Sequence, residues 1–253
     1  MRPTNVLNGA LPGCVKTKHG CLRLEEEYIA GVIDCELGGL TNAAAALEAQ
    51  AIAARTYLAS HLSRRGLDQS VRTSARFQCW RRPKRRQSIL AAQATAGLLI
   101  SWRGDLISAN YVAGTRKLSN RCTPKPPKSS GYPYERWPAL LAARNGSQDV
   151  RRGLTGTDWT EIYVTRNEGR RGNLVRHTPI GLNVTYNRGA LSQNGAMCLA
   201  TRRGFETIDI LKYYYGEDIQ LVIHDGVASQ RASTRWSDLA MRTIPMRMSR
   251  LSP

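Results

Sequence analysis

The clearest pattern of apolar and polar positions lies near the start of the chain. Leu24, Tyr28 and Val32 recur at every fourth position, so they share one face of a helix. Glu36 follows at the same interval and ends this apolar face with a carboxylate. The spacing therefore predicts an amphipathic helix over 22–36.

A second, alanine-rich helix is predicted over 42–62. Gly38 and Gly39 separate it from the first helix, and Thr41 or Asn42 offers a side chain that can cap its beginning. Its predicted buried face consists of Leu47, Ala51, Ala54 and Leu58. Because most of these side chains are small, another element can pack close to this helix.

Weaker patterns follow along the chain. In order, they predict a short strand over 72–80, a helix over 87–99, a hairpin over 98–114 that turns at Arg103-Gly104-Asp105, a long loop over 115–134, a short helix within 137–146, a β-like run over 161–164, a helix that begins near Ser192, an amphipathic helix over 205–216 and a strand over 219–223. Proline and glycine make 1–21 an irregular arm, and the basic tail 224–253 is expected to be extended. We therefore expect one α+β domain over 22–223, with helices packed on a mixed or antiparallel sheet.

The chain has 253 residues and a strong excess of basic side chains. It carries 37 Lys and Arg against 19 Asp and Glu, for a net charge of +18. Such a charge favours polyanionic partners, namely nucleic acid, anionic lipid or an acidic cell-wall polymer. No apolar run approaches the roughly 18 residues that a membrane-spanning helix needs, so no membrane span is expected.

The densest run of basic residues is RRPKRR at 81–86, directly after Trp80. This run is either a solvated loop tip or a contact site for an anionic polymer. The Trp80 ring does not decide between polymers, because an indole stacks on a base or on a sugar. No DNA- or RNA-binding motif accompanies the run, so nucleic acid is not the expected partner.

The six cysteines are scattered along the chain and form no CxxC pair. They occur at 14, 21, 35, 79, 122 and 198. Zinc-ligand spacing is therefore absent. The even number fits disulfides in an oxidising compartment, and buried free thiols are the equally weighted alternative. Because the arm at 1–21 has little else to order it, we expect Cys14 or Cys21 to fix it by a disulfide.

Glu36 needs a physical reason, because an unpaired charge between two largely buried helices is costly. One reason is an ion pair with Arg55 or another arginine. The other is chemistry, since desolvation favours the protonated form that a proton donor needs. Asp34, two residues earlier, points elsewhere on a helix, so no partner carboxylate is conspicuous near Glu36.

Three blocks of the sequence resemble the stage II sporulation protein D family of peptidoglycan lytic transglycosylases and amidase enhancers. The first block joins LEEEYIAGVIDCELGG to LEAQAIAARTYLASH, which is similar to the family's L-x-A-Q-A-V-A-A-R-T-Y helix. The second is QATAGLLISWRGDLISANY at 93–111, and the third is LSQNGAMCLATRRGFETIDILKYYYGEDIQL at 191–221. The blocks come in the family's order, so the resemblance extends over 22–221 and implies a single α+β catalytic domain.

The chain departs from the family pattern at two places. The family's glycine- and histidine-rich approach to the Ser-Gln pair is replaced by YNRGAL at 186–191, without histidine. Some members bind zinc through a cysteine and a histidine after the tyrosine that corresponds to Tyr111, where this chain reads VAGT at 112–115. We therefore expect no metal and no cofactor.

The resemblance implies that Glu36 is the catalytic acid. Cleavage of a glycosidic bond needs a proton on the leaving oxygen. A lytic transglycosylase needs only one carboxylate, because the 6-hydroxyl of the muramic sugar is the nucleophile and the same glutamate accepts its proton. The resemblance further implies substrate-binding positions at Gln78, Tyr111, Ser192, Gln193 and Arg55.

Each of these five positions also has a structural alternative. Gln78 either binds an N-acetyl group or hydrogen-bonds within its strand, and Tyr111 either lines the cleft or belongs to the core. Ser192 and Gln193 either cap a helix N-terminus or reach substrate. Arg55 holds either Glu36 or neighbouring backbone, and a structural role is favoured. We expect Glu36 to face a cleft that Gln78, Ser192 and Gln193 also line.

The expected function is cleavage of peptidoglycan glycan strands between N-acetylmuramic acid and N-acetylglucosamine. The alternative is an inactive wall-binding or structural component, for instance one that holds neighbouring subunits of a phage particle. Residues 1–14 lack the charged and apolar regions of a signal peptide. Action at the cell wall or periplasm would then follow release by lysis or assembly into a virion.

Overall fold

The computed structural model describes residues 11–37, 43–74, 77–125, 158–180 and 186–223. Its strands are β1 (Cys14–Thr17), β2 (Gly20–Arg23), β3 (Leu98–Trp102), β4 (Asp105–Leu106), β5 (Ser108–Val112), β6 (Asn187–Ser192) and β7 (Gln220–Ile223). Its helices are η1 (Leu24–Ile29), α1 (Ala30–Glu36), α2 (Ala44–Arg65), α3 (Arg86–Ala94), η3 (Asp158–Tyr163), η4 (Gly172–Leu174), α6 (Gln193–Arg203) and α7 (Thr207–Tyr215). The predicted α+β class is confirmed. Among these helices, none combines the length and apolar character that crossing a membrane requires.

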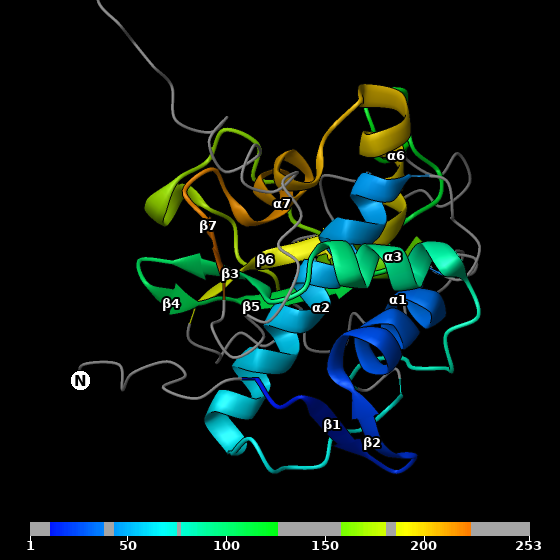
Figure 1. Ribbon diagram of the computed structural model, residues 1–253. Helices are drawn as coiled ribbons and strands as arrows, with labels where there is room; N and C mark the ends of the chain where they lie inside the picture. The colour runs from blue at the N-terminus through cyan, green and yellow to red at the C-terminus, as the bar shows by residue number, and fades with distance from the viewer. Residues whose placement is uncertain (1–10, 38–42, 75–76, 126–157, 181–185, 224–253) are drawn as a thin grey trace, which may run out of the picture.

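Helix α2 runs through the middle of the molecule, between the strands β3–β7 and the helices α1 and α3 (Figure 1). Its predicted apolar face, made of Leu47, Ala51, Ala54 and Leu58, is buried in a core shared with η1, α1 and α3. Its opposite side, with Ala46, Ala49 and Ala53, packs in a second core with the strands, α6 and α7. Because α2 is buried on two sides, its alanines allow close packing in both directions.

The chain enters α1 through a hairpin and a π-helical turn. The prediction of an irregular arm over 1–21 is wrong from Cys14 onward. There β1 and β2 pair as an antiparallel hairpin, with Cys14 opposite Arg23. Val15 is buried in the core that also holds Tyr28, so apolar packing orders this segment despite its breakers. The predicted helix over 22–36 begins at Leu24 instead, with η1 running directly into α1.

Two small sheets lie beside α2 on the side opposite α1 (Figure 1). In the first, β3 pairs antiparallel with β4 and β7. The predicted hairpin is confirmed here, since Trp102 pairs with Asp105 and both turn residues have positive φ, 54° at Arg103 and 85° at Gly104. The hairpin is shorter than expected, because the chain after Leu106 leaves β3.

The second sheet pairs β5 with β6 in parallel. In this register Tyr111 lies opposite Leu191 and Val112 opposite Ser192. The end of β6 continues directly into α6. The pairing therefore brings the beginning of α6 next to the end of β5, although about 80 residues separate them in sequence.

Three predicted elements differ in the structure. The described part of 72–80 forms no strand, because Cys79 donates its N–H to the Glu36 side chain rather than to a ladder. Residues 161–163 belong to the 3₁₀ helix η3 rather than to a β-like run, and Glu161 accepts a hydrogen bond there from the N–H of Thr115. The helix predicted over 87–99 ends at Ala94, because Leu98 onward pairs with β7. The predicted cap at 41–42, the helix within 137–146 and the tail 224–253 lie outside the described residues.

All six cysteines form disulfides, so the free-thiol alternative is wrong. The pairs are Cys14–Cys21, Cys35–Cys79 and Cys122–Cys198. A disulfide was expected in the N-terminal arm and is present. It joins Cys14 to Cys21, so it closes the β1–β2 hairpin rather than linking the arm to a distant element.

Candidate functional site

Glu36 is the last residue of α1, and both of its carboxylate oxygens accept hydrogen bonds. Oε1 accepts from the backbone N–H of Cys79 at 2.9 Å, and Oε2 accepts from Nε2 of Gln193 at 3.1 Å. Burial raises the pKa of the Glu36 carboxyl, while the bonds from Gln193 and Cys79 act in the opposite direction. The side chain is thus partly desolvated and fixed, with its protonated form favoured over that of an ordinary glutamate.

The segment 77–81 lies directly against α1. At Gly31 a Cβ would lie 2.2 Å from Nε1 of Trp80 and 2.5 Å from the carbonyl oxygen of Arg81, so only glycine allows this approach. Nε1 of Trp80 donates to the carbonyl oxygen of Glu27 at 2.8 Å. This close contact delivers the N–H of the neighbouring Cys79 to the end of α1.

Gln78 and Tyr111 are joined in a buried network. Nε2 of Gln78 donates to the Tyr111 hydroxyl at 2.9 Å and to the carbonyl oxygen of Ala54 at 3.0 Å, while Oε1 accepts from the Tyr28 hydroxyl at 2.8 Å. Burial and the nearby Glu36 carboxylate raise the pKa of Tyr111 well above its usual range. The Gln78 side chain is fully buried and uses both amide hydrogens within the protein, one of them to hold the Tyr111 hydroxyl. Its contact with an N-acetyl group stays a prediction.

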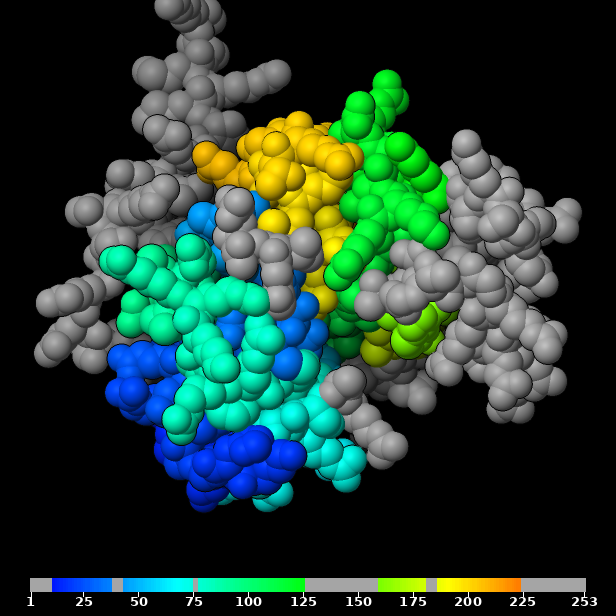
Figure 2. All heavy atoms as spheres, turned by 90° about the vertical axis from the view of Figure 1, so that its right-hand side faces the viewer, coloured from blue at the N-terminus to red at the C-terminus, as the bar shows by residue number. Residues whose placement is uncertain are grey.

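The Ser192–Gln193 pair divides its two expected roles. Ser192 is buried and caps α6, since its Oγ accepts from the N–H of Gly195 at 2.9 Å and donates to the carbonyl oxygen of Ala113 at 3.4 Å. Gln193 reaches Glu36. Figure 2 shows one face of the molecule, where the blue atoms of α1 and α2 lie between the blue-green segment near α3 and the yellow atoms of β6 and α6.

Of the two alternatives for Arg55, the contact with neighbouring backbone is present and an ion pair with Glu36 is not. Its guanidinium forms an ion pair with Glu25 rather than Glu36, with Nε 2.8 Å from a Glu25 oxygen. It also donates to the carbonyl oxygens of Leu98 and Ala92 at 3.2 Å each. Arg55 has no exposed surface, which favours the structural role over substrate binding.

Two other carboxylates near these segments form ion pairs with arginines. Asp34 is buried and forms ion pairs with Arg81 at 3.1 Å and Arg85 at 3.3 Å. It therefore holds the basic loop 81–86. Glu161 is also buried and forms an ion pair with Arg166.

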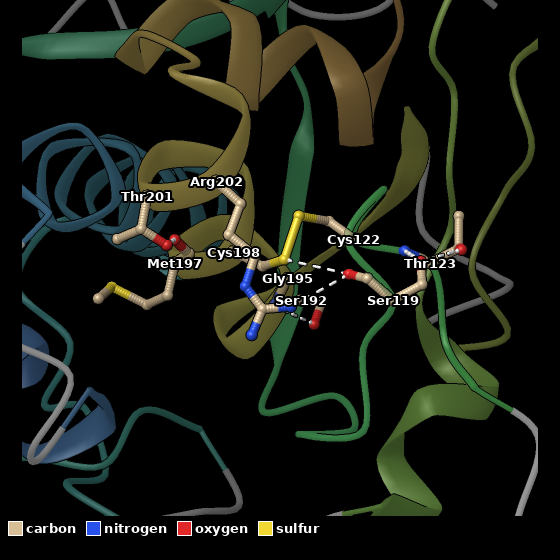
Figure 3. Close-up of a disulfide and its surroundings, with 9 residues drawn as sticks. All are labelled: Ser119, Cys122, Thr123, Ser192, Gly195, Met197, Cys198, Thr201 and Arg202. Carbon is tan, nitrogen blue, oxygen red and sulfur yellow. Dashed lines mark hydrogen bonds between the residues drawn. A yellow bond between two sulfur atoms is a disulfide. The ribbon is translucent and has the colours of Figure 1, made fainter.

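The position of Cys122 bears on metal binding. Its sulfur is bonded to Cys198 of α6, and Ser119 and Arg202 lie beside the disulfide (Figure 3). Ser192, at the beginning of the same helix, is drawn in the same view. Within the described ranges, no three His, Cys, Asp or Glu side chains are grouped so that they could hold a metal ion.

The sequence did not reveal two hydrogen-bond donors in the site. These are the Cys79 N–H, which bonds to Glu36, and the Tyr28 hydroxyl, which bonds to Gln78. Tyr28 looked like one more member of an apolar helix face. A signal for Cys79 was present, because one cysteine precedes Glu36 and another follows Gln78. A disulfide between these two cysteines necessarily brings Glu36 and Gln78 together.

A family model recognises the segment that carries much of this site. Residues 22–102 match the model of SpoIID, described as stage II sporulation protein. Over this segment the chain is similar to the SpoIID family. The match confirms the resemblance and relates the chain to a cell-wall-related sporulation protein family. It includes Glu36, Gln78 and Arg55, while Tyr111, Ser192 and Gln193 lie outside it. A comparison with curated proteins gave no match.

Proposed function

We propose that this protein is a peptidoglycan lytic transglycosylase that cleaves the bond between N-acetylmuramic acid and N-acetylglucosamine. One observation carries the proposal. Glu36 is partly buried, has a raised pKa and is fixed by two hydrogen bonds from segments distant in sequence. A carboxyl in this setting is suited to donate a proton near neutral pH.

The reaction follows from a single acid. Protonated Glu36 gives its proton to the glycosidic oxygen as the bond to the anomeric carbon breaks. Positive charge develops on that carbon, and the 6-hydroxyl oxygen of the same muramic sugar attacks it. The Glu36 carboxylate takes the proton from this hydroxyl, so the acid is regenerated and a 1,6-anhydro ring forms without consumption of water.

The neighbours of Glu36 fit these steps. The Cys79 and Gln193 donors stabilise the carboxylate that exists between the two proton transfers. Tyr111 accepts a hydrogen bond from Gln78, so its own O–H is available to a sugar oxygen. The other carboxylates described above, Asp34 and Glu161, are held by arginines and are poorly placed to activate a water.

The test is digestion of purified cell walls, followed by mass spectrometry of the soluble products. Lytic cleavage gives muramic ends that lack one water relative to reducing ends. Reducing ends would mean hydrolysis and would refute the one-carboxylate mechanism.

A second candidate is a non-catalytic wall-binding component, for instance of a phage particle. The exposed basic side chains of the loop 81–86 favour this function. The buried Asp34 fixes this loop through ion pairs with Arg81 and Arg85. Wall binding without any soluble product would make it the better account.

A further inference from the structure

The disulfide Cys35–Cys79 lies directly beside the proposed acid. Cys35 precedes Glu36 in α1, and the backbone N–H of Cys79 donates to Glu36 at 2.9 Å. The Cα atoms of the two cysteines are 5.7 Å apart. A single covalent link therefore joins the residue before the acid to the residue that donates to it.

The segment that contains Cys79 has few other backbone contacts with the fold. In its described part it belongs to no strand, and the backbone bond from Arg81 N–H to the Gly31 carbonyl oxygen is long, at 3.4 Å. Its other attachments are made through side chains: Gln78 bonds to Tyr28 and Ala54, Trp80 to the Glu27 carbonyl oxygen of η1, and Arg81 to Asp34 of α1. The disulfide is the covalent link between Cys79 itself and α1, and it acts together with the packing of Trp80 against Gly31.

We propose that the Cys35–Cys79 disulfide positions Glu36, by holding the Cys79 N–H against its carboxylate, and thereby makes cleavage depend on an oxidised protein. Cys79 is a positioning residue, because it acts on substrate only through Glu36. The inference rests on the proposed function and adds a redox requirement to the same site.

The three disulfides differ in ways that make this proposal testable. Cys35 and Cys79 are both partly exposed, so a reductant can reach their bond. Cys122 and Cys198 are buried at 0% and 7% exposure. The bond between Cys14 and Cys21 is accessible but lies within the β1–β2 hairpin, which contributes none of the residues around Glu36.

The experiment compares Cys35→Ser/Cys79→Ser with the control Cys14→Ser/Cys21→Ser. Initial rates of wall cleavage are measured across pH, with melting temperature and wall binding as checks of folding. We expect the first variant to be about 10–100-fold slower than the control, because small displacements of a catalytic group have effects of this size. Its activity should also extend to higher pH, because loss of an N–H donor to the carboxylate raises the pKa of Glu36.

The pH shift separates positioning from general stability. A disulfide that only stabilised the fold would change the melting temperature and leave the pH profile unchanged. Equal rates and equal pH profiles in the two folded variants would overturn the inference, while the proposed function would stand. Absence of cleavage by the wild-type protein would instead count against the proposed function.

Two further measurements keep the inference testable in those cases. The titration of the Glu36 carboxyl, followed by carbon NMR with Glu36→Gln to assign the signal, needs no activity. An unchanged titration in Cys35→Ser/Cys79→Ser refutes the positioning. If that variant fails to fold, dithiothreitol is applied to the wild-type protein, and thiol mapping identifies the opened bond. Each reduction transfers two electrons and two protons from the dithiol, giving two cysteine thiols and cyclic oxidised dithiothreitol.

Reduction confined to Cys35–Cys79 should slow cleavage by the same 10–100-fold, and reoxidation should restore the rate. Full activity with this bond open would overturn the proposal.

Discussion

Gln193 donates a hydrogen bond from its side-chain amide to the carboxylate of Glu36, across 3.1 Å and 157 positions of sequence. Gln193 begins α6 and Glu36 ends α1, so the bond joins the first residue of one helix to the last residue of the other. Neither residue would be held this way by its own helix. The parallel pairing of β5 with β6 fixes where α6 begins, and the contact follows from that pairing.

Replacing Glu36 by glutamine should abolish most of the activity. General acid–base catalysis contributes about 10²–10⁴ in rate, so Glu36→Gln should lose roughly this factor in wall digestion. Binding to insoluble wall should persist, because it depends on the basic surface. The matched control is Glu26→Gln, which changes an exposed glutamate paired with Arg23 in the adjacent turn. Equal losses in both variants would contradict the assignment of Glu36.

The raised pKa of Glu36 predicts a pH-dependent cost in stability. An acid whose pKa is higher in the folded state than in the unfolded chain favours folding at low pH, and this contribution is lost as pH rises through the folded pKa. Glu36→Gln has no such group. Its melting temperature should therefore match that of the wild type below about pH 4.5 and exceed it at neutral pH. A constant difference at all pH values would mean that the pKa is not raised.

The Tyr111 hydroxyl is expected to contribute to the reaction. Tyr111→Phe keeps the ring and removes the group that Gln78 holds in place. The rate should fall roughly tenfold, which corresponds to a hydrogen bond of about 1.4 kcal/mol. Tyr57→Phe is the control, since the Tyr57 ring packs near Tyr111 with 6.3 Å between centroids and its hydroxyl is not bonded to Gln78. If both variants retain full activity, the hydroxyl of Tyr111 is a structural group only.

Arg55 should matter for folding rather than chemistry. Arg55→Met leaves the Glu25 carboxylate without its buried partner, which should cost about 3–5 kcal/mol in the free energy of unfolding. Arg23→Met breaks an exposed ion pair with Glu26 and should cost less than about 1 kcal/mol. Chemical denaturation measures both values. The double variant Glu25→Leu/Arg55→Met should recover part of the loss, and a further decrease would contradict this account.

The basic loop 81–86 is expected to bind the cell wall through its positive charges. Arg82→Glu/Lys84→Glu should weaken sedimentation with insoluble wall severalfold, and the difference from wild type should shrink as salt screens the charges. Arg116→Glu/Arg121→Glu makes the same change of charge at exposed positions outside the loop. Equal effects of the two variants would mean that net charge, rather than this loop, determines binding.

The sequence by itself predicted the main helices and the resemblance to the SpoIID family. The four-residue spacing of Leu24, Tyr28 and Val32 and the alanines of α2 were sufficient, because burial on a helix face imposes a period that is local in sequence. The helix that starts after Ser192 was equally readable, since capping depends on neighbouring residues. The catalytic role of Glu36, by contrast, was implied by the family resemblance of the surrounding segment and not by its spacing alone.

Only the tertiary structure decided the partners of these residues. Arg55 binds Glu25 rather than Glu36, and the Gln78 segment is held by a disulfide and side chains rather than by a strand. The parallel pairing of β5 with β6, which carries Gln193 to Glu36, leaves no short-range pattern in the sequence. Ion pairs, disulfides and strand pairings join residues far apart in the chain, and the free energy that selects among alternative partners comes from packing of the whole domain.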